Sequence, residues 1–179
     1  MRASGAKRTR ERIRYSFAAS SFGPLLLAQS SGGLAWLSFV DSEEQELAAL
    51  AKHFPHANLE LAAPEEPWIA EGVRAAESLS RQTGLAPLDL RGTPFQRSVW
   101  DALLAIPFGE TRSYADVARS IGRPTAVRAV AQACGANPVA IIVPCHRVVG
   151  SDGSLTGYAS GLGRKRDLLE REGWAQTGA

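Results

Sequence analysis

The stretch that decides the fold is residues 114–150, "YADVARSIGRPTAVRAVAQACGANPVAIIVPCHRVVG". Its first part, 114–122, has the composition of a short helix that ends at a glycine. The following residues, 123–138, predict a second helix, with Pro124 in its first turn and Gly135 at its C-terminal end. Because only a tight turn separates the two helices, the pattern indicates a helix-turn-helix.

One side of the second helix carries apolar residues at positions i, i+3, i+4 and i+7, namely Val127, Val130, Ala131 and Cys134. We expect this stripe to pack inward, which makes Cys134 a structural residue. The other side carries Arg128 and a polar glutamine among small residues, namely Ala126, Ala129, Gln132 and Ala133. Such a face can approach nucleic acid closely, but an ordinary amphipathic helix with a solvated arginine gives the same pattern.

The apolar run 139–143 reads as a buried strand that ends at a proline, directly before Cys145, His146 and Arg147. Histidine and arginine neighbours favour the thiolate form of cysteine, so this pattern favours a reactive thiol. The alternative is a buried, inert cysteine. A metal site is less favoured, because no second Cys or His stands at ligand spacing.

The N-terminal half has a different pattern. Three short runs separated by Gly, Pro and Ser predict an antiparallel meander, at residues 12–20, 23–31 and 32–40. Helices are predicted after them, at residues 41–54 and 66–84, and a capped helix at 93–106 begins the second part of the chain. The Gly- and Pro-containing residues 84–94 read as a linker or an edge segment. We therefore predict an N-terminal α/β domain over 1–90, with a basic tail at 1–12, and a second domain over 91–179.

Composition indicates a globular chain, with 45% hydrophobic residues and a net charge of +2. The charge is unevenly distributed, because residues 41–90 carry three Lys/Arg against ten acids while 91–179 carry eleven against seven. A basic face for a polyanion is possible, although solvated surface explains the same charges. Two cysteines form no disulfide framework, and no apolar run is long enough to span a membrane. We expect a cytoplasmic protein without a membrane partner.

The stretch "NPVAIIVPCHRVVGSDGSLTGYASGLGRKRDLLEREG" closely resembles the O6-alkylguanine-DNA alkyltransferase family, and in particular the C-terminal half of the bacterial Ada protein. The flanking segments "GTPFQRSVWDALLAIPFGETRSYADVA" and "IGRPTAVRAVAQACGANP" follow the same family in the expected order. The resemblance covers about residues 13–174. It implies an α+β fold, with an RNase-H-like N-terminal α/β domain and a C-terminal winged-helix DNA-binding domain.

The resemblance also implies a function, which is direct-reversal DNA repair. The family flips an O6-alkylguanine out of double-stranded DNA through the minor groove, and a cysteine removes the alkyl group in a single turnover. It implies no cofactor and no metal, because the lesion itself is the alkyl donor. A monomer is expected, with cooperative binding along DNA and activity on O4-alkylthymine left open.

Four residues match the family's catalytic positions. The resemblance assigns Cys145 as the alkyl acceptor and His146 as a base that acts through a water. Glu172 would orient and polarise that histidine. Asn137 would brace the turn of the active site.

Four further residues match positions that contact the DNA or the lesion. Tyr114 would rotate the target phosphate and could donate a proton to the leaving guanine. Arg128 would fill the gap left by the flipped base. Tyr158 would lie in the lesion pocket, and Ser151 at the edge that faces the DNA.

Two rival functions are considered. A damage-marking protein would bind lesions without repairing them, but such relatives lack the acceptor cysteine that is present here as Cys145. A Cys-His hydrolase would need an oxyanion hole, and it leaves the helix-turn-helix without a role.

Overall fold

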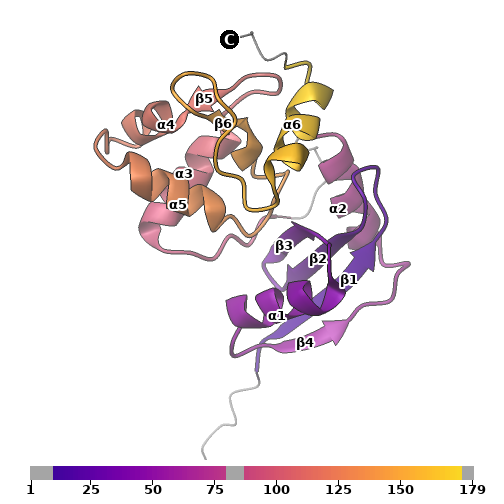
Figure 1. Cartoon of the computed structure of the whole chain (residues 1–179). Helices are drawn as coiled ribbons and strands as arrows, with labels where there is room; N and C mark the ends of the chain where they lie inside the picture. Colours follow the sequence, from indigo (N-terminus) through magenta and orange to yellow (C-terminus); the bar gives the residue numbers. More distant parts are fainter. Residues whose placement is uncertain (1–9, 80–86, 175–179) are drawn as a thin grey trace, which may run out of the picture.

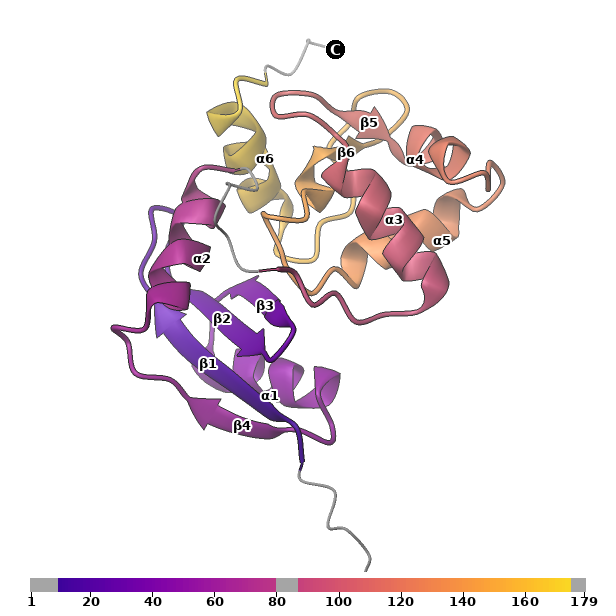
Figure 2. The same ribbon diagram turned by 180° about the vertical axis from the view of Figure 1, so that it is seen from behind.

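The computed structural model describes residues 10–79 and 87–174. Figures 1 and 2 show a sheet flanked by helices at one end of the molecule and a cluster of short helices at the other. We call these the N-terminal lobe (residues 10–79) and the C-terminal lobe (residues 94–174). The predicted α+β class is confirmed. The boundary at residue 90 stays a prediction, and most of the basic tail at 1–12 lies outside the described residues.

The N-terminal lobe is built on a four-stranded sheet in the order β3-β2-β1-β4. Its strands are β1 (Arg12–Ala18), β2 (Leu25–Ser30), β3 (Gly33–Phe39) and β4 (Asn58–Leu61). The first three pair antiparallel, which confirms the predicted meander. The fourth, β4, pairs parallel with β1 and was not predicted, because its polar–apolar alternation extends over only four residues.

Two helices cover opposite faces of this sheet, α1 (Glu43–His53) and α2 (Pro67–Glu77). Side chains alternate across a strand, so Leu26 packs in the cluster that contains Leu50 of α1, while Leu27 packs in the cluster that contains Ile69 of α2. The second cluster continues into the C-terminal lobe, so one core joins the two lobes.

The second helix is shorter than the predicted 66–84. It ends at Glu77, and Leu79 then has a φ of 53°, in the left-handed region that continues no helix. The glycine predicted to stop it, Gly84, lies outside the described residues.

The C-terminal lobe consists of short elements around the same core. They are α3 (Pro94–Leu104), β5 (Arg112–Ser113), α4 (Tyr114–Ser120), α5 (Val127–Gly135), the single 3-10 turn η1 (Cys145–Arg147), β6 (Val148–Val149) and α6 (Leu162–Arg171). The strands β5 and β6 pair parallel. The helices α4 and α5 form the predicted helix-turn-helix, whose turn contains Gly122 at a φ of 69°.

The prediction for the second helix of this motif was wrong in two details. Helix α5 begins at Val127, so Pro124 precedes the helix instead of lying in its first turn. Its buried side also differs from the predicted stripe, because Val127 is 37% exposed and Ala131 is exposed, whereas Ala133 is buried. Alanine suits either side of a helix, so the contacts with the rest of the lobe decide; the buried Nε1 of Trp100 donates to the carbonyl of Ala133 at 2.9 Å.

Residues 139–143 are not the predicted strand. They are buried, as expected, but they form a compact turn in which the amide of Val143 donates to the carbonyl of Val139 at 3.0 Å. Ile141 has a φ of 70°, a backbone conformation that interrupts extended chain. The apolar run therefore indicated burial correctly, but periodicity could not distinguish a buried turn from a buried strand.

The edge of β3 is covered by two segments from outside the sheet. Leu34 pairs with the linker, donating to the carbonyl of Pro87 at 2.8 Å and accepting from the amide of Asp89 at 2.9 Å. Leu37 pairs with the turn before Cys145, donating to the carbonyl of Pro138 at 2.9 Å and accepting from the amide of Ala140 at 2.9 Å. The N-terminal sheet thus holds this turn directly.

Within the described residues, none of the helices has the length and apolar character of a membrane span.

Candidate active site

Asn137 holds both ends of the turn that precedes Cys145. Its Oδ1 accepts from the amide of Val139 at 3.0 Å, and its Nδ2 donates to the carbonyl of Val143 at 2.8 Å. The same Nδ2 lies 3.2 Å from the Sγ of Cys145. One amide side chain therefore fixes the turn and contacts the thiol, which is the geometry expected for a brace.

Cys145 is buried at the start of the turn η1, with 7% of its surface exposed. Burial raises the pKa of this thiol, and the hydrogen bond from Asn137 and the charge of Lys165 oppose the rise only in part. The expectation that the sequence neighbours favour the thiolate was therefore wrong. The reason is geometric, because His146 and Arg147 bond to a carboxylate instead of the thiol.

That carboxylate is Glu172, the residue that follows α6. Its Oε1 lies 2.8 Å from the Nε2 of His146, and its Oε2 accepts from the amide of Gly109 at 3.0 Å and from the Nε of Arg147 at 3.0 Å. All three side chains are buried. A buried ion pair of this kind needs several hydrogen bonds to offset the loss of hydration, and Glu172 has them.

The charges in this cluster follow from the same contacts. Burial alone would raise the pKa of Glu172, but the hydrogen bonds from His146 and Arg147 outweigh it, and the pKa is lowered. Burial lowers the pKa of His146, with Glu172 opposing the change. Near neutral pH the pair is therefore a carboxylate beside a neutral imidazole. The Nδ1 of this imidazole is buried and has no hydrogen-bond partner among the described residues.

Arg147 completes the cluster; the sequence suggested it as a neighbour of the thiol and did not indicate its pairing with Glu172. Besides Glu172, its guanidinium donates to the carbonyl of Ile106 at 2.6 Å and to that of Leu79, after α2, at 2.7 Å. It thereby joins the cluster around Glu172 to the N-terminal lobe. An arginine directly between His146 and two valines was a signal, because a charged residue in so apolar a segment implies a buried partner.

A cavity of about 200 Å³ opens beside Cys145. Tyr158 lines it together with Cys134 and Asn137, and the hydroxyl of Tyr158 is buried without a hydrogen-bond partner among the described residues. Burial raises the pKa of Tyr158 well above its usual value, so the phenol is neutral. The structure therefore places an apolar ring with one unpaired polar atom at the wall of a cavity that reaches the thiol.

Tyr114, the first residue of α4, contacts the loop that precedes Tyr158. Its hydroxyl donates toward the carbonyls of Thr156 and Gly157, at 3.0 Å from each. Burial raises its pKa to about 12. The loop has a second anchor that the sequence did not indicate, the fully buried Lys165, whose Nζ donates to the carbonyl of Thr156 at 2.7 Å.

Comparison with known proteins places this arrangement in a family. A sequence model described as "6-O-methylguanine DNA methyltransferase, DNA binding domain" matches residues 94–174. A methylated-DNA–protein-cysteine methyltransferase of Methanosarcina acetivorans is 43% identical over 164 residues, which are 89% of this chain and 97% of that protein. The chain belongs to this family. The predicted family is thereby confirmed.

Other relatives extend the likeness. The bifunctional transcriptional activator/DNA repair enzyme Ada of Escherichia coli is 46% identical over 163 residues, which cover 89% of this chain. The chain spans 45% of the length of that protein and of the Salmonella typhimurium regulatory protein ada. The crystal structure of Mycobacterium tuberculosis OGT in complex with DNA matches with a TM-score of 0.73 and 42% identity, covering 89% of this chain and 92% of that one.

Two residues that the sequence assigned to DNA contact, Arg128 and Ser151, lie apart from the cluster around Glu172. Arg128 is exposed on the outer side of α5, beside the exposed Val127. Ser151 is exposed in the loop that follows β6. Both side chains are therefore on the surface of the C-terminal lobe.

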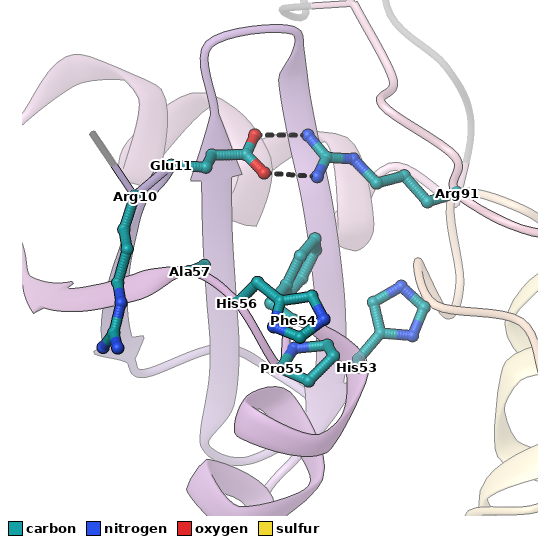
Figure 3. Close-up of a pocket in the computed structure, with 8 residues that line it drawn as sticks. All are labelled: Arg10, Glu11, His53, Phe54, Pro55, His56, Ala57 and Arg91. Atoms are coloured by element: carbon teal, nitrogen blue, oxygen red, sulfur yellow. Dashed lines mark hydrogen bonds and ion pairs between the residues drawn. The ribbon is translucent and has the colours of Figure 1, made fainter. Parts of the chain in front are cut away.

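A larger cavity, of about 520 Å³, lies in the N-terminal lobe and contains none of the predicted site residues. Figure 3 shows His53 and His56 at its wall, with Arg91 of the linker paired to Glu11 across it. Arg91 also donates to Asp89 at 2.6 Å, so its charge is already balanced. Within the described residues no group of three or more His, Cys, Asp or Glu side chains could hold a metal.

Proposed function

We propose that this protein repairs alkylated guanine in DNA by transferring the alkyl group to its own Cys145. The observation that carries the proposal is the position of Cys145, at a cavity on one side and beside the His146–Glu172 pair on the other. In the transfer a bond forms between Sγ and the alkyl carbon, and the bond between that carbon and O6 of guanine breaks. The thioether has no easy reversal, so each molecule reacts once.

The thiol must lose its proton before it attacks. His146 is neutral, its Nε2 is fixed by Glu172, and its free Nδ1 is the site for a water that relays the proton from Cys145. The ionised carboxylate of Glu172 stabilises the imidazolium that results. The raised pKa of Cys145 keeps it as a thiol until a substrate excludes bulk water and completes the relay.

The leaving guanine gains negative charge at O6 and needs a proton. A tyrosine hydroxyl with a pKa of about 12 stays protonated at neutral pH and can supply it, which gives Tyr114 this role. Its bonds to the carbonyls of the loop 156–157 hold the hydroxyl near the cavity. Tyr158 stacks on or beside the flipped base, and Asn137 keeps the turn in place.

Double-stranded DNA is the partner, because a base in the stack cannot meet a buried thiol and must be flipped out. The flipped base enters from the minor groove, α5 lies in the groove and Arg128 fills the vacated position in the stack. Ser151 contacts the DNA at the edge of the site. The protein acts as a monomer in the cytoplasm, and the lesion is O6-alkylguanine.

Intact mass before and after mixing with duplex DNA that contains one O6-methylguanine tests the proposal. We expect a single gain of one CH2 group, mapped to Cys145 and absent in Cys145→Ala, which still folds and binds the DNA. No gain with retained lesion binding would indicate a damage-marking protein instead. Repeated turnover on an ester substrate would indicate a hydrolase.

A further inference from the structure

The cavity beside Cys145 is formed by both lobes. Besides the residues of the C-terminal lobe, five residues of the N-terminal lobe line it, namely Trp36, Leu37, Ser38, Glu46 and Ala49. They come from β3 and from α1. The hydrogen bonds of Leu37 fix the contact between β3 and the turn before Cys145. The sequence assigned no role in the reaction to any of the five.

Three of these side chains form a hydrogen-bonded row. The Nε1 of Trp36 donates to the Oγ of Ser38 at 2.9 Å, and that hydroxyl donates to the Oε2 of Glu46 at 2.5 Å. All three are half-buried. The row therefore holds one carboxylate in a fixed position at the wall of the cavity.

The charge of this carboxylate is not cancelled inside the cavity. Among the described residues that line it, Glu46 alone is charged. Arg164, whose charge interacts with that of Glu46, is already paired with Asp41 by two bonds of 2.7 and 2.8 Å and stacked on the ring of Phe39 at 4.8 Å. The charge of the buried Lys165 also acts on Cys145, but Lys165 does not line the cavity, and its Nζ donates to the carbonyls of Val148 and Thr156. Glu46 is therefore the charged group that a substituent inside the cavity meets directly.

The geometry of the reaction determines which part of the substrate lies next to Glu46. In a displacement by Cys145, the transferred carbon lies between Sγ and O6, so the remainder of the substituent must extend into the space that Sγ faces. We propose that Glu46 determines which substituents are accepted: neutral and hydrogen-bond-donating ones are transferred readily, and anionic ones are disfavoured. This inference rests on the proposed function, because it concerns the substituent that Cys145 receives.

Two lesions of similar size separate charge from bulk. Duplexes with O6-(2-hydroxyethyl)guanine and with O6-carboxymethylguanine are compared in single-turnover transfer at saturating DNA, followed by intact mass. Each rate is divided by the same variant's rate on O6-methylguanine, which reports whether that variant is folded and active. The variants are wild type, Glu46→Gln, which keeps an oxygen for Ser38, and Glu44→Gln, which removes an exposed charge from α1 outside the cavity.

We expect wild type to transfer the hydroxyethyl group about tenfold faster than the carboxymethyl group. Glu46→Gln should bring the two rates within about twofold, whereas Glu44→Gln should keep the wild-type ratio. The wild-type ratio should also narrow at high salt, which tests the charge without any substitution. Equal wild-type rates, or a ratio unchanged in an active Glu46→Gln, would overturn the inference. Absence of transfer from O6-methylguanine in wild type would instead overturn the proposed function.

Discussion

At the scale of single residues, the site places Cys145 and His146 in two different environments, although they are adjacent in the sequence. Cys145 and His146 are neighbours in the chain, yet the cysteine faces the cavity and Asn137, while the histidine faces Glu172. The thiol is buried, and the imidazole of His146 is kept neutral and oriented by Glu172. The structure thus favours a protein that is unreactive until a substrate fills the cavity.

Glu172→Gln tests the orienting carboxylate. Glutamine can still accept hydrogen bonds, but it cannot stabilise the imidazolium of His146, so we expect transfer to slow by about tenfold to a hundredfold. Because Glu172 opposes the lowering of the His146 pKa, its loss lowers that pKa further and moves the acidic limb of the pH–rate profile to lower pH. DNA affinity should stay within about twofold of wild type. An unchanged pH profile together with a large loss of affinity would contradict the assigned role.

The same substitution has a cost in stability. Arg147 would keep its charge in a buried site and lose its counter-ion, a change that typically costs about 3–5 kcal/mol. Urea unfolding of Glu172→Gln measures this cost. Transfer rates should therefore be compared at a temperature where both proteins remain folded.

Cys134 gives a prediction for alkaline pH. Burial, with the neighbouring Cys145 thiol, raises its pKa to about 12, whereas an unfolded chain releases the proton near about 8.5. Between these values the unfolded state binds fewer protons than the folded state, so stability falls as pH rises, by at most about 1.4 kcal/mol per pH unit. Denaturant unfolding at a series of pH values should show a shallower fall in Cys134→Ala. An equal slope in both proteins would exclude Cys134 as the source.

At the scale of elements, helix α5 places Arg128 on the outside. We expect Arg128→Ala to slow repair in duplex DNA by about tenfold, because flipping a base costs a few kcal/mol and the arginine offsets part of it. Transfer from the free modified base needs no flipping and should change little. Arg97→Ala, which removes an exposed arginine from α3, is the charge-matched control. Equal losses on both substrates for Arg128→Ala would rule out a role in flipping.

The sequence predicts those elements that have a clear hydrophobic periodicity or clear turn and cap residues at their ends. The meander 12–40 and the helix-turn-helix were recovered, because their glycines, caps and alternation are local signals. The turn at 139–143 was not, since its conformation depends on Asn137 and on the pairing with Leu37, which lies a hundred residues earlier. The inward side of α5 was misassigned for a similar reason, because Ala131 and Ala133 are equally suited to either side.

The same division holds for the site. The motif supplied Cys145, His146 and Glu172, and the structure brings them, with Asn137, into one cluster. The motif could not predict the interior contacts of Arg147 and Lys165, since their carbonyl partners carry no sequence signal. Backbone acceptors are the same at every position, so only the folded chain identifies them.

At the scale of the whole molecule, the N-terminal lobe acts as a support for the reactive turn. Strand β3 pairs with the linker at Leu34 and with the turn at Leu37, so displacement of either segment disturbs the other. Arg147 adds a second connection through the carbonyl of Leu79. The lobe that bears no motif of the reaction therefore determines whether Asn137 and Cys145 keep their positions.

A substitution at Gly33 tests this support, because Gly33 lies directly against the linker at Pro87. It has a φ of 130°, and a Cβ there would lie 1.7 Å from the carbonyl oxygen of Pro87, so the linker would have to leave the edge of β3. We expect Gly33→Ala to lower the free energy of unfolding by more than about 2 kcal/mol and to slow transfer as well. Gly23→Ala is the matched control, because Gly23 has a φ of 95° but open space around it, so only the backbone strain of about 1 kcal/mol applies. If both variants lost the same stability and kept the wild-type transfer rate, the linker contact at β3 would not support the active site.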